Sequence, residues 1–297
     1  MDDTQTGGGA LMTETPALAA RLRWRYGRSA VGVVLSALCA GLAAAMLVLI
    51  LGYVAIQGLG ALNLSFLTQL PRPVGVSGGG VANGIIGTLI IVGIAVLLAA
   101  PVGVLAGVHL ALYGRGKIAN AVRFLADVLA GIPSIAIGLF AYTVFVAPFR
   151  HFSALSASVA FAILMLPLII RTTEESIVRV PTRVREGALA LGLSNYAATM
   201  HIVVPAARAG ILTGLLLSLA RVTGETAPLL FTAFGSQFME LNPTNPMAVL
   251  ALQVFTYAIS PYEDWHRQAW AGAFLLIMAV LVLNVVARLV LRNRFES

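Results

Sequence analysis

The chain has 297 residues, of which 59% are apolar and only 10% are charged, with a mean hydropathy of +0.92. That composition excludes an ordinary soluble domain and indicates a protein embedded in a bilayer. The formal net charge of +7 does not indicate a nucleic-acid partner, because 18 of the 19 basic residues stand beside or between long apolar runs. The single cysteine, Cys39, excludes an intrachain disulfide and a cysteine metal cluster.

The first 28 residues are polar and end in four arginines directly before a long apolar run. We interpret residues 1–28 as a cytoplasmic tail and 29–57 as an uncleaved first transmembrane helix, because this run is too long for a signal peptide. A spanning helix needs about 20 apolar residues, and five further runs qualify. The six predicted spans are about 29–57, 83–112, 122–147, 153–172, 209–234 and 271–291.

The lysines and arginines between the spans indicate the orientation, because cytoplasmic loops retain positive charge. With the N-terminus inside, three basic residues face outward: Arg72, Arg150 and Arg267. Fifteen others then lie on the cytoplasmic side, namely Arg21, Arg23, Arg25, Arg28, Arg115, Lys117, Arg123, Arg171, Arg179, Arg183, Arg185, Arg208, Arg288, Arg292 and Arg294. We therefore predict an all-α membrane protein with six transmembrane helices and both termini in the cytoplasm.

Two predicted extracytoplasmic loops are long, 58–82 and 235–270. The second contains an apolar stretch, 247–259, that we expect to form a short re-entrant or interfacial helix. Residues 83–294 are expected to form a core of five helices together with the loops between them.

Prolines lie inside the second to fifth spans, where each removes a backbone hydrogen bond and favours a kink. They are Pro101, Pro133, Pro167 and Pro228. Either the kinked helices line a pathway, or proline is simply common in membrane helices. Two Gly-x-x-x-Gly pairs, Gly103 with Gly107 and Gly210 with Gly214, would permit close helix contact, but chance is the better explanation in a chain with 29 glycines.

The longest polar segment between spans, 171–208, lies on the cytoplasmic side. Its apolar residues recur at helical spacing over 183–191, and Gly192 is expected to end that helix. Ser194 can cap a second short helix, which we expect to stop before Pro205. The segment therefore predicts a helix-glycine-helix elbow that faces the cytoplasm.

This elbow resembles the EAA loop of the permeases of binding-protein-dependent ABC importers. In that loop Glu-Ala-Ala is followed by three residues, a glycine, nine residues and Ile-x-Leu-Pro. The matching residues here are Glu186, Gly187, Ala188, Gly192, Ile202 and Pro205. Gly187 replaces the first alanine of the family pattern and Val204 replaces its leucine, and both changes keep the character of the side chain.

The resemblance implies a type I importer permease whose region 183–203 inserts into a separate ATPase subunit. Gly192 would allow the tight elbow, and Glu186 would hold the shape of the loop or contact the ATPase. The alternative is an ordinary cytoplasmic hairpin. No phosphate-binding Gly-x-x-x-x-Gly-Lys-Ser/Thr sequence occurs, so ATP and magnesium are expected on the partner ATPase, with no cofactor in this chain.

Arg221 lies near the middle of the fifth predicted span, where an arginine costs roughly 2.5–3.5 kcal/mol and needs a partner or a ligand. Glu225 follows on the same helical face and can pair with it. Thr223 and Thr226 add hydroxyl groups, and Pro228 is expected to bend the helix beside them. Arginine with a carboxylate suits a partly protonated oxyanion such as hydrogen phosphate, whereas a purely structural ion pair is the alternative.

Two segments resemble the A-type permease subunits of phosphate importers, and they read ARVTGETAPLLFTAFG at 220–235 and GGGVANGIIGTL at 78–89. The resemblance implies that Arg221 and Glu225 line the translocation path. It also implies a homologous permease as partner in a heterodimer, two copies of a cytoplasmic ABC ATPase and an extracytoplasmic phosphate-binding protein. A cell-membrane location with lipid contacts is expected, and nucleic acid is not.

The remaining charges suggest local roles. Asp127 is expected to pair with Arg123 four residues earlier, and Glu174 and Glu175 are expected to form a solvated face. No metal site is expected, because the four histidines show no ligand spacing.

Two other functions remain as alternatives, and a third is excluded. An importer of another oxyanion differs only in its solute. A secondary transporter would show inverted repeats. An intramembrane protease would need a nucleophilic serine segment, which the sequence lacks.

Overall fold

The computed structural model describes residues 16–73, 76 and 78–292, with side chains described over 29–285. Most of the predicted tail, residues 1–15, and the last residues of the predicted core, 293–294, lie outside the described residues. The described helices are α1 (Pro16–Leu59), α2 (Leu64–Thr68), α3 (Ala82–Tyr113), α4 (Lys117–Gly131), α5 (Ser134–Ala141), α6 (Ala154–Val178), α7 (Thr182–Ala190), α8 (Asn195–Ala198), α9 (Val204–Thr223), α10 (Ala227–Thr232), α11 (Leu250–Ala258) and α12 (Glu263–Arg292). Two π-helical turns, η1 (Tyr142–Val146) and η2 (Thr199–Val203), join or extend them.

The chain divides into two units, residues 1–53 and the compact unit from Val54 onward. In the first unit α1 runs without interruption from Pro16 and so extends into the predicted polar tail. Its apolar part, Ser29–Leu59, is long enough to cross a membrane.

Within the described residues, five helices are long and apolar enough to cross a membrane, and a bent pair makes a sixth span if it is counted as one. That pair is Lys117–Gly131 with Ser134–Val146, bent by 103°. The sequence predicted one helix over 122–147. The helix breaks because Ile132, which precedes Pro133, adopts an extended backbone, and a proline disfavours the helical conformation in the residue before it.

Helix α6 lies at the centre of the second unit and packs against α3, α4, α5, α9 and α10. Its contacts with α3 and α9 run through the two glycine pairs. A Cβ on Gly103 would come within 2.7 Å of Ile169, and one on Gly107 within 2.6 Å of Thr173. Helix α9 uses the second pair in the same way, because a Cβ on Gly210 or Gly214 would overlap the side chains of Ser176 and Thr172 respectively. These glycines are therefore contact sites between helices and not chance occurrences.

The fifth span differs from its prediction at both ends. The chain stays helical past Pro205, through α8, η2 and α9, where we expected a stop. Proline removes one backbone hydrogen bond, and the wider η2 turn, closed by Val204 N–H to Thr199 O, directly precedes it. At the other end α9 stops at Thr223, so Pro228 lies in the first turn of α10 and does not kink a continuous helix.

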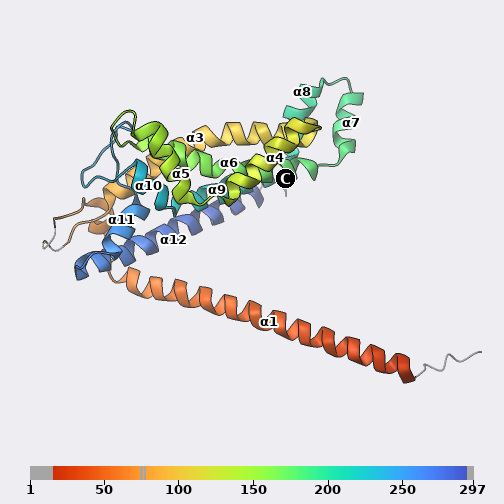
Figure 1. The fold of residues 1–297 in the computed structure, drawn as a ribbon, viewed down its shortest axis with the longest axis horizontal. Coiled ribbons are helices and arrows are strands. Elements are labelled where there is room, and N and C mark those ends of the chain that lie inside the picture. Colours follow the sequence, from red (N-terminus) through yellow and green to blue (C-terminus); the bar gives the residue numbers. More distant parts are fainter. Residues whose placement is uncertain (1–15, 74–75, 77, 293–297) are drawn as a thin grey trace, which may run out of the picture. The chain divides into compact units, whose positions relative to one another are not determined.

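The short helices α2, α10 and α11 lie at one end of the second unit, and α7 and α8 lie at the opposite end (Figure 1). Helix α11, within the apolar stretch predicted at 247–259, is buried at Leu250, Ala251, Leu252 and Tyr257. The N–H of its first residue, Leu250, donates to Thr88 Oγ1 of α3 at 2.9 Å. Because the charge distribution puts both termini in the cytoplasm, the end with α7 and α8 is cytoplasmic and the end with α11 is extracytoplasmic.

Candidate functional site

The cytoplasmic elbow forms as its residue types dictate. Gly192 has φ +87°, a left-handed conformation that glycine adopts without strain, and it terminates α7. Leu193 N–H then donates to Ala188 O at 3.2 Å. Ser194 caps α8 by accepting a hydrogen bond from Ala197 N–H at 3.2 Å. The predicted glycine turn and serine cap are both confirmed.

The residues predicted for ATPase coupling differ in their exposure. Ala188 is buried at 3% exposure and holds α7 against the rest of the elbow, whereas Ile202 is half-buried in η2. The exposed members are Glu186, Gly187, Gly192 and Pro205. Glu186 makes no ion pair with any described residue, so its carboxylate is available to another chain. Leu191 is 85% exposed and Tyr196 is 71% exposed. An acidic group beside exposed apolar side chains is typical of a surface that binds another protein.

Arg185 contributes a contact that sequence reasoning missed. Its Nη2 donates to Asn195 Oδ1 at 3.0 Å and so joins α7 to α8. Its guanidinium carbon lies 5.6 Å from the centroid of the Tyr113 ring, which ends α3. The elbow is therefore attached to a transmembrane helix by a side chain. The sequence gives no local signal of these contacts, because Asn195 is 10 positions and Tyr113 is 72 positions away from Arg185.

Arg221 and Glu225 lie together, as the sequence predicted. Arg221 Nε is 4.0 Å from Glu225 Oε1, and the two side chains are 46% and 23% exposed. Glu225 follows the end of α9, in a tight turn where Gly224 N–H donates to Arg221 O at 3.3 Å and Glu225 N–H donates to Val222 O at 3.1 Å. This distance is at the upper limit for an ion pair. Much of the guanidinium is therefore accessible to a further acceptor.

The two predicted threonines do not join this pair. Thr223 Oγ1 donates to Leu219 O at 2.8 Å, and Thr223 lines a different feature, an apolar groove of about 560 Å³ between α3, α9, α11 and α12. Thr226 directly precedes α10, and its carbonyl accepts from Leu229 N–H at 3.1 Å. Only Arg221 and Glu225 of the four residues therefore form a charged site.

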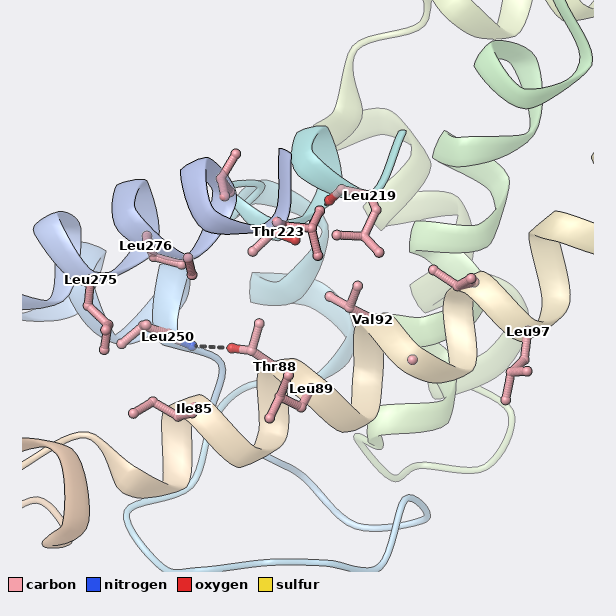
Figure 2. A pocket seen from close by; sticks show the side chains of 15 residues that line it. Ile85, Thr88, Leu89, Val92, Leu97, Leu219, Thr223, Leu250, Leu275 and Leu276 are labelled. Atoms are coloured by element: carbon pink, nitrogen blue, oxygen red, sulfur yellow. Dashed lines mark hydrogen bonds between the residues drawn. The ribbon is translucent and has the colours of Figure 1, made fainter. Parts of the chain in front are cut away.

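Figure 2 shows the groove that Thr223 lines, with leucine, isoleucine and valine side chains converging from the surrounding helices. Its two hydroxyl groups are already bonded, that of Thr88 to the backbone of Gly84 and Leu250 and that of Thr223 to Leu219. An anion moved into such a lining would lose its hydration without gaining donors, which is strongly unfavourable. The groove is therefore not a route for a charged solute.

A second charged cluster lies in the cytoplasmic half of the unit and corrects the predicted pairing. Arg123 Nε donates to Glu174 Oε1 at 2.6 Å, and its Nη2 donates to the carbonyls of Leu110 and Gly114 at 3.0 and 3.3 Å. Asp127 does not pair with Arg123 as we expected. Instead it accepts two hydrogen bonds from Arg171, one of them from Nε at 2.9 Å.

Glu174 is correspondingly not part of a solvated face, since only 12% of its side chain is exposed. It lies between Arg123 and Arg171, whose Nη1 is 3.8 Å away. Glu175 does follow the expectation, being 66% exposed and 3.8 Å from Arg179. Arg123, Glu174, Arg171 and Asp127 form what we call the cytoplasmic charge cluster, which joins the end of α3 to α4 and α6.

Residues 99–293 match the family described as the binding-protein-dependent transport system inner membrane component. This match covers the cytoplasmic elbow, Arg221 and Glu225. The chain belongs to this family. It is a multi-pass membrane permease and a non-catalytic component of an ABC importer, and it works with ATPase partners.

Several curated relatives are similar to this permease over most of its length. The phosphate transport system permease protein PstA of Haemophilus influenzae is 45% identical over 239 residues, which are 80% of this chain and 84% of the relative. PstA of Yersinia pestis is 39% identical over 91% of this chain and 92% of its own. A probable PstA of Methanocaldococcus jannaschii is 34% identical over 78% and 81%.

Among solved structures, the inward-facing MetNI methionine ABC transporter contains a chain similar to this permease. The TM-score is 0.60, over 72% of this chain and 95% of that chain, at 16% sequence identity. The likeness confirms the predicted type I importer fold.

Proposed function

We propose that this permease forms half of the transmembrane pathway of an ATP-driven importer of inorganic phosphate. The observation that carries the proposal is the loose Arg221–Glu225 pair, in a chain 34–45% identical to phosphate transport permeases. The guanidinium presents a planar fork of donors that matches two oxygens of a phosphate. Glu225 can accept the proton-bearing oxygen of hydrogen phosphate. A fully deprotonated oxyanion has no O–H group to donate to Glu225, and the negative charge of the carboxylate would repel it.

The remaining parts of the importer follow from the same proposal. A homologous permease completes the pathway as a heterodimer, two copies of an ABC ATPase bind at the elbows, and an extracytoplasmic phosphate-binding protein delivers the solute. In this chain the ATPase would contact Glu186 and the exposed apolar residues Leu191 and Tyr196, with Gly192 allowing the turn that presents them.

Radiolabelled phosphate uptake tests the proposal in cells that lack this chain and every other phosphate importer. Cells complemented with wild type are compared with Arg221→Gln, and sulfate and molybdate uptake are measured in parallel. Loss of a hydrogen bond to a charged group costs roughly 1.5–3 kcal/mol, so Arg221→Gln should lower phosphate uptake about tenfold or more. Arg267→Gln is the matched control, because Arg267 is 70% exposed, belongs to the predicted outer loop 235–270 and pairs with Asp264 three residues earlier.

The amount of permease in the membrane is measured in the same cells. Uptake lost with normal amounts of protein supports a role in the pathway. Loss of the protein itself would instead indicate a structural ion pair. Phosphate uptake that does not depend on the wild-type chain would refute the phosphate assignment and leave the importer fold standing.

A further inference from the structure

Helix α7, which carries Glu186, has little apolar contact to hold it in one orientation. It is nine residues long, and Ala188 is its only buried residue. A helix of this length is marginally stable by itself, because nucleation costs more than a few hydrogen bonds return. The methyl group of Ala188 fixes where α7 lies but does not prevent the helix from turning about its own axis. A longer side chain is needed for that.

Arg185 supplies this side chain. It precedes Ala188 by three residues and therefore lies on the same face of the helix. Arg185 is half-buried, and its Nε is enclosed and makes no hydrogen bond to any described residue, so the side chain is directed into the protein. The bond to Asn195 Oδ1 and the ring of Tyr113 hold the guanidinium at two points. Glu186, next in the chain, points about 100° away and is exposed.

The contact with Tyr113 connects α7 to a helix that the backbone does not join to the elbow. Helix α6 leads into α7, and η2 leads into α9, so the chain itself links the elbow to α6 and α9. Helix α3 has no such link, because α4, α5 and α6 follow it before the elbow begins. Its cytoplasmic half packs against η2 and α9 in an apolar cluster that includes Val108 and Val203. Arg185 adds a contact from α7 to Tyr113, the last residue of α3.

The guanidinium group suits both contacts at once. It is planar, so its edge donates hydrogen bonds while its face stacks on an aromatic ring. A lysine ammonium group is a compact point charge without such a fork. Glutamine at this position keeps an amide donor but has no charge to attract the ring of Tyr113. Arginine is therefore the side chain that joins α7 to α8 and to α3 together.

We infer that Arg185 is a positioning residue for coupling. It sets the orientation in which α7 presents Glu186, and it passes a displacement of the elbow to α3 through Tyr113. The inference rests on the proposed function, which makes the elbow the surface for the ATPase and phosphate the solute. It adds a route from the elbow to α3 that does not run along the backbone.

The test compares variants of the complete importer, reconstituted in proteoliposomes with its phosphate-loaded binding protein. Arg185→Gln and Tyr113→Leu should each lower the phosphate taken up per ATP hydrolysed about two- to fivefold, the factor expected for loss of a cation–π contact at an exposed site. Tyr113→Phe keeps an aromatic face and should retain the wild-type ratio. The double variant should match Arg185→Gln alone, because both substitutions remove the same contact. Arg179→Gln is the matched control, since it removes one positive charge from an 81% exposed side chain at the end of α6.

A fluorescent label on α3 gives a second readout that does not depend on the solute. It is attached at Leu97→Cys, a position whose side chain is 74% exposed, in a Cys39→Ser background. The emission of the label should change when ATP is added to the importer with otherwise wild-type sequence. The change should be smaller with Arg185→Gln, although the rate of ATP hydrolysis stays the same.

Two results would overturn the inference. One is an Arg185→Gln importer with the wild-type ratio of uptake to hydrolysis and the wild-type change in emission. The other is loss of the ATPase from the purified Arg185→Gln importer, because Arg185 would then be a contact of the ATPase. A wild-type importer that hydrolyses ATP without taking up phosphate contradicts the proposed solute, whereas the label on α3 still tests Arg185. The two failures are therefore distinguishable.

Discussion

The cytoplasmic charge cluster offers a quantitative test of the structure, because the sequence and the structure disagree about the partner of Arg123. Helical spacing favours Asp127, four residues later, whereas the structure pairs Arg123 with Glu174 on another helix. Three substitutions, Arg123→Gln, Asp127→Asn and Glu174→Gln, combined pairwise, measure each coupling free energy in a double-mutant cycle.

The structure ranks the expected coupling energies. Arg123 and Glu174 are 2.6 Å apart and only 27% and 12% exposed, and a hydrogen bond to a charged group contributes about 1.5–3 kcal/mol, so we expect about 2 kcal/mol for this pair. Asp127 bonds to Arg171 instead, through side chains that are 58% and 36% exposed. Solvent screening makes such an exposed pair weak. Arg123 and Asp127 should show no direct coupling.

The free energy of unfolding is measured for the purified importer as SDS is titrated into mixed micelles, with loss of native tryptophan fluorescence as the signal. The coupling free energy between Arg123 and Glu174 must exceed those measured in the other two cycles. A larger coupling between Arg123 and Asp127 would refute the reasoning, because it would show that the local helical pair, and not the contact between helices, is the stable one.

Two further predictions concern glycines. Gly214→Ala adds a methyl group that overlaps the Thr172 side chain and should lower the free energy of unfolding by about 1–3 kcal/mol in the same titration. Gly93→Ala, with open space around it, should leave the free energy of unfolding unchanged. Equal effects of the two substitutions would refute close packing at Gly214. A proline at position 192 cannot adopt the observed φ of +87°, so Gly192→Pro should abolish stimulation of ATP hydrolysis by the phosphate-loaded binding protein. Gly187→Ala, with open space around it, should leave that stimulation intact. Normal stimulation in Gly192→Pro would refute a role for the elbow.

Much of the architecture could be predicted from the sequence, because the deciding forces are local. Hydropathy over about 20 residues locates a span, and the charges at its ends give its direction. Gly192 and Ser194 are equally local signals, since one supplies a left-handed turn and the other a side-chain cap. The break at Pro133 follows from the restriction that proline places on the residue before it, although its angle of 103° does not.

Contacts between helices could not be predicted in the same way. A Gly-x-x-x-Gly pair permits close approach, but only the neighbouring helix decides whether the space is used, as Thr172 does at Gly214. Arg123 has a carboxylate at the favourable local spacing and still bonds to a residue 51 positions away. Pro205 shows the reverse case, where a local rule predicted a helix end and the helix continued through a π-helical turn. For Arg123, the contact with another helix outweighed a local pair that contributes only about 0.2–0.5 kcal/mol.

Helix α6 connects the features that local rules missed. Its first turn is capped by the loop between α10 and α11, its second half contacts the glycines of α3 and α9, and Arg171 and Glu174 in the same half belong to the cytoplasmic charge cluster. Four residues after α6 ends, α7 begins the elbow. If the ATPase moves the elbow, as we propose, it would act on a helix whose close-packed glycine contacts and ion pairs transmit its displacement to α3, α4 and α9. We accordingly expect the weakened packing of Gly214→Ala to reduce phosphate uptake more than it reduces ATP hydrolysis, because the force would still be generated but would be poorly transmitted to α9.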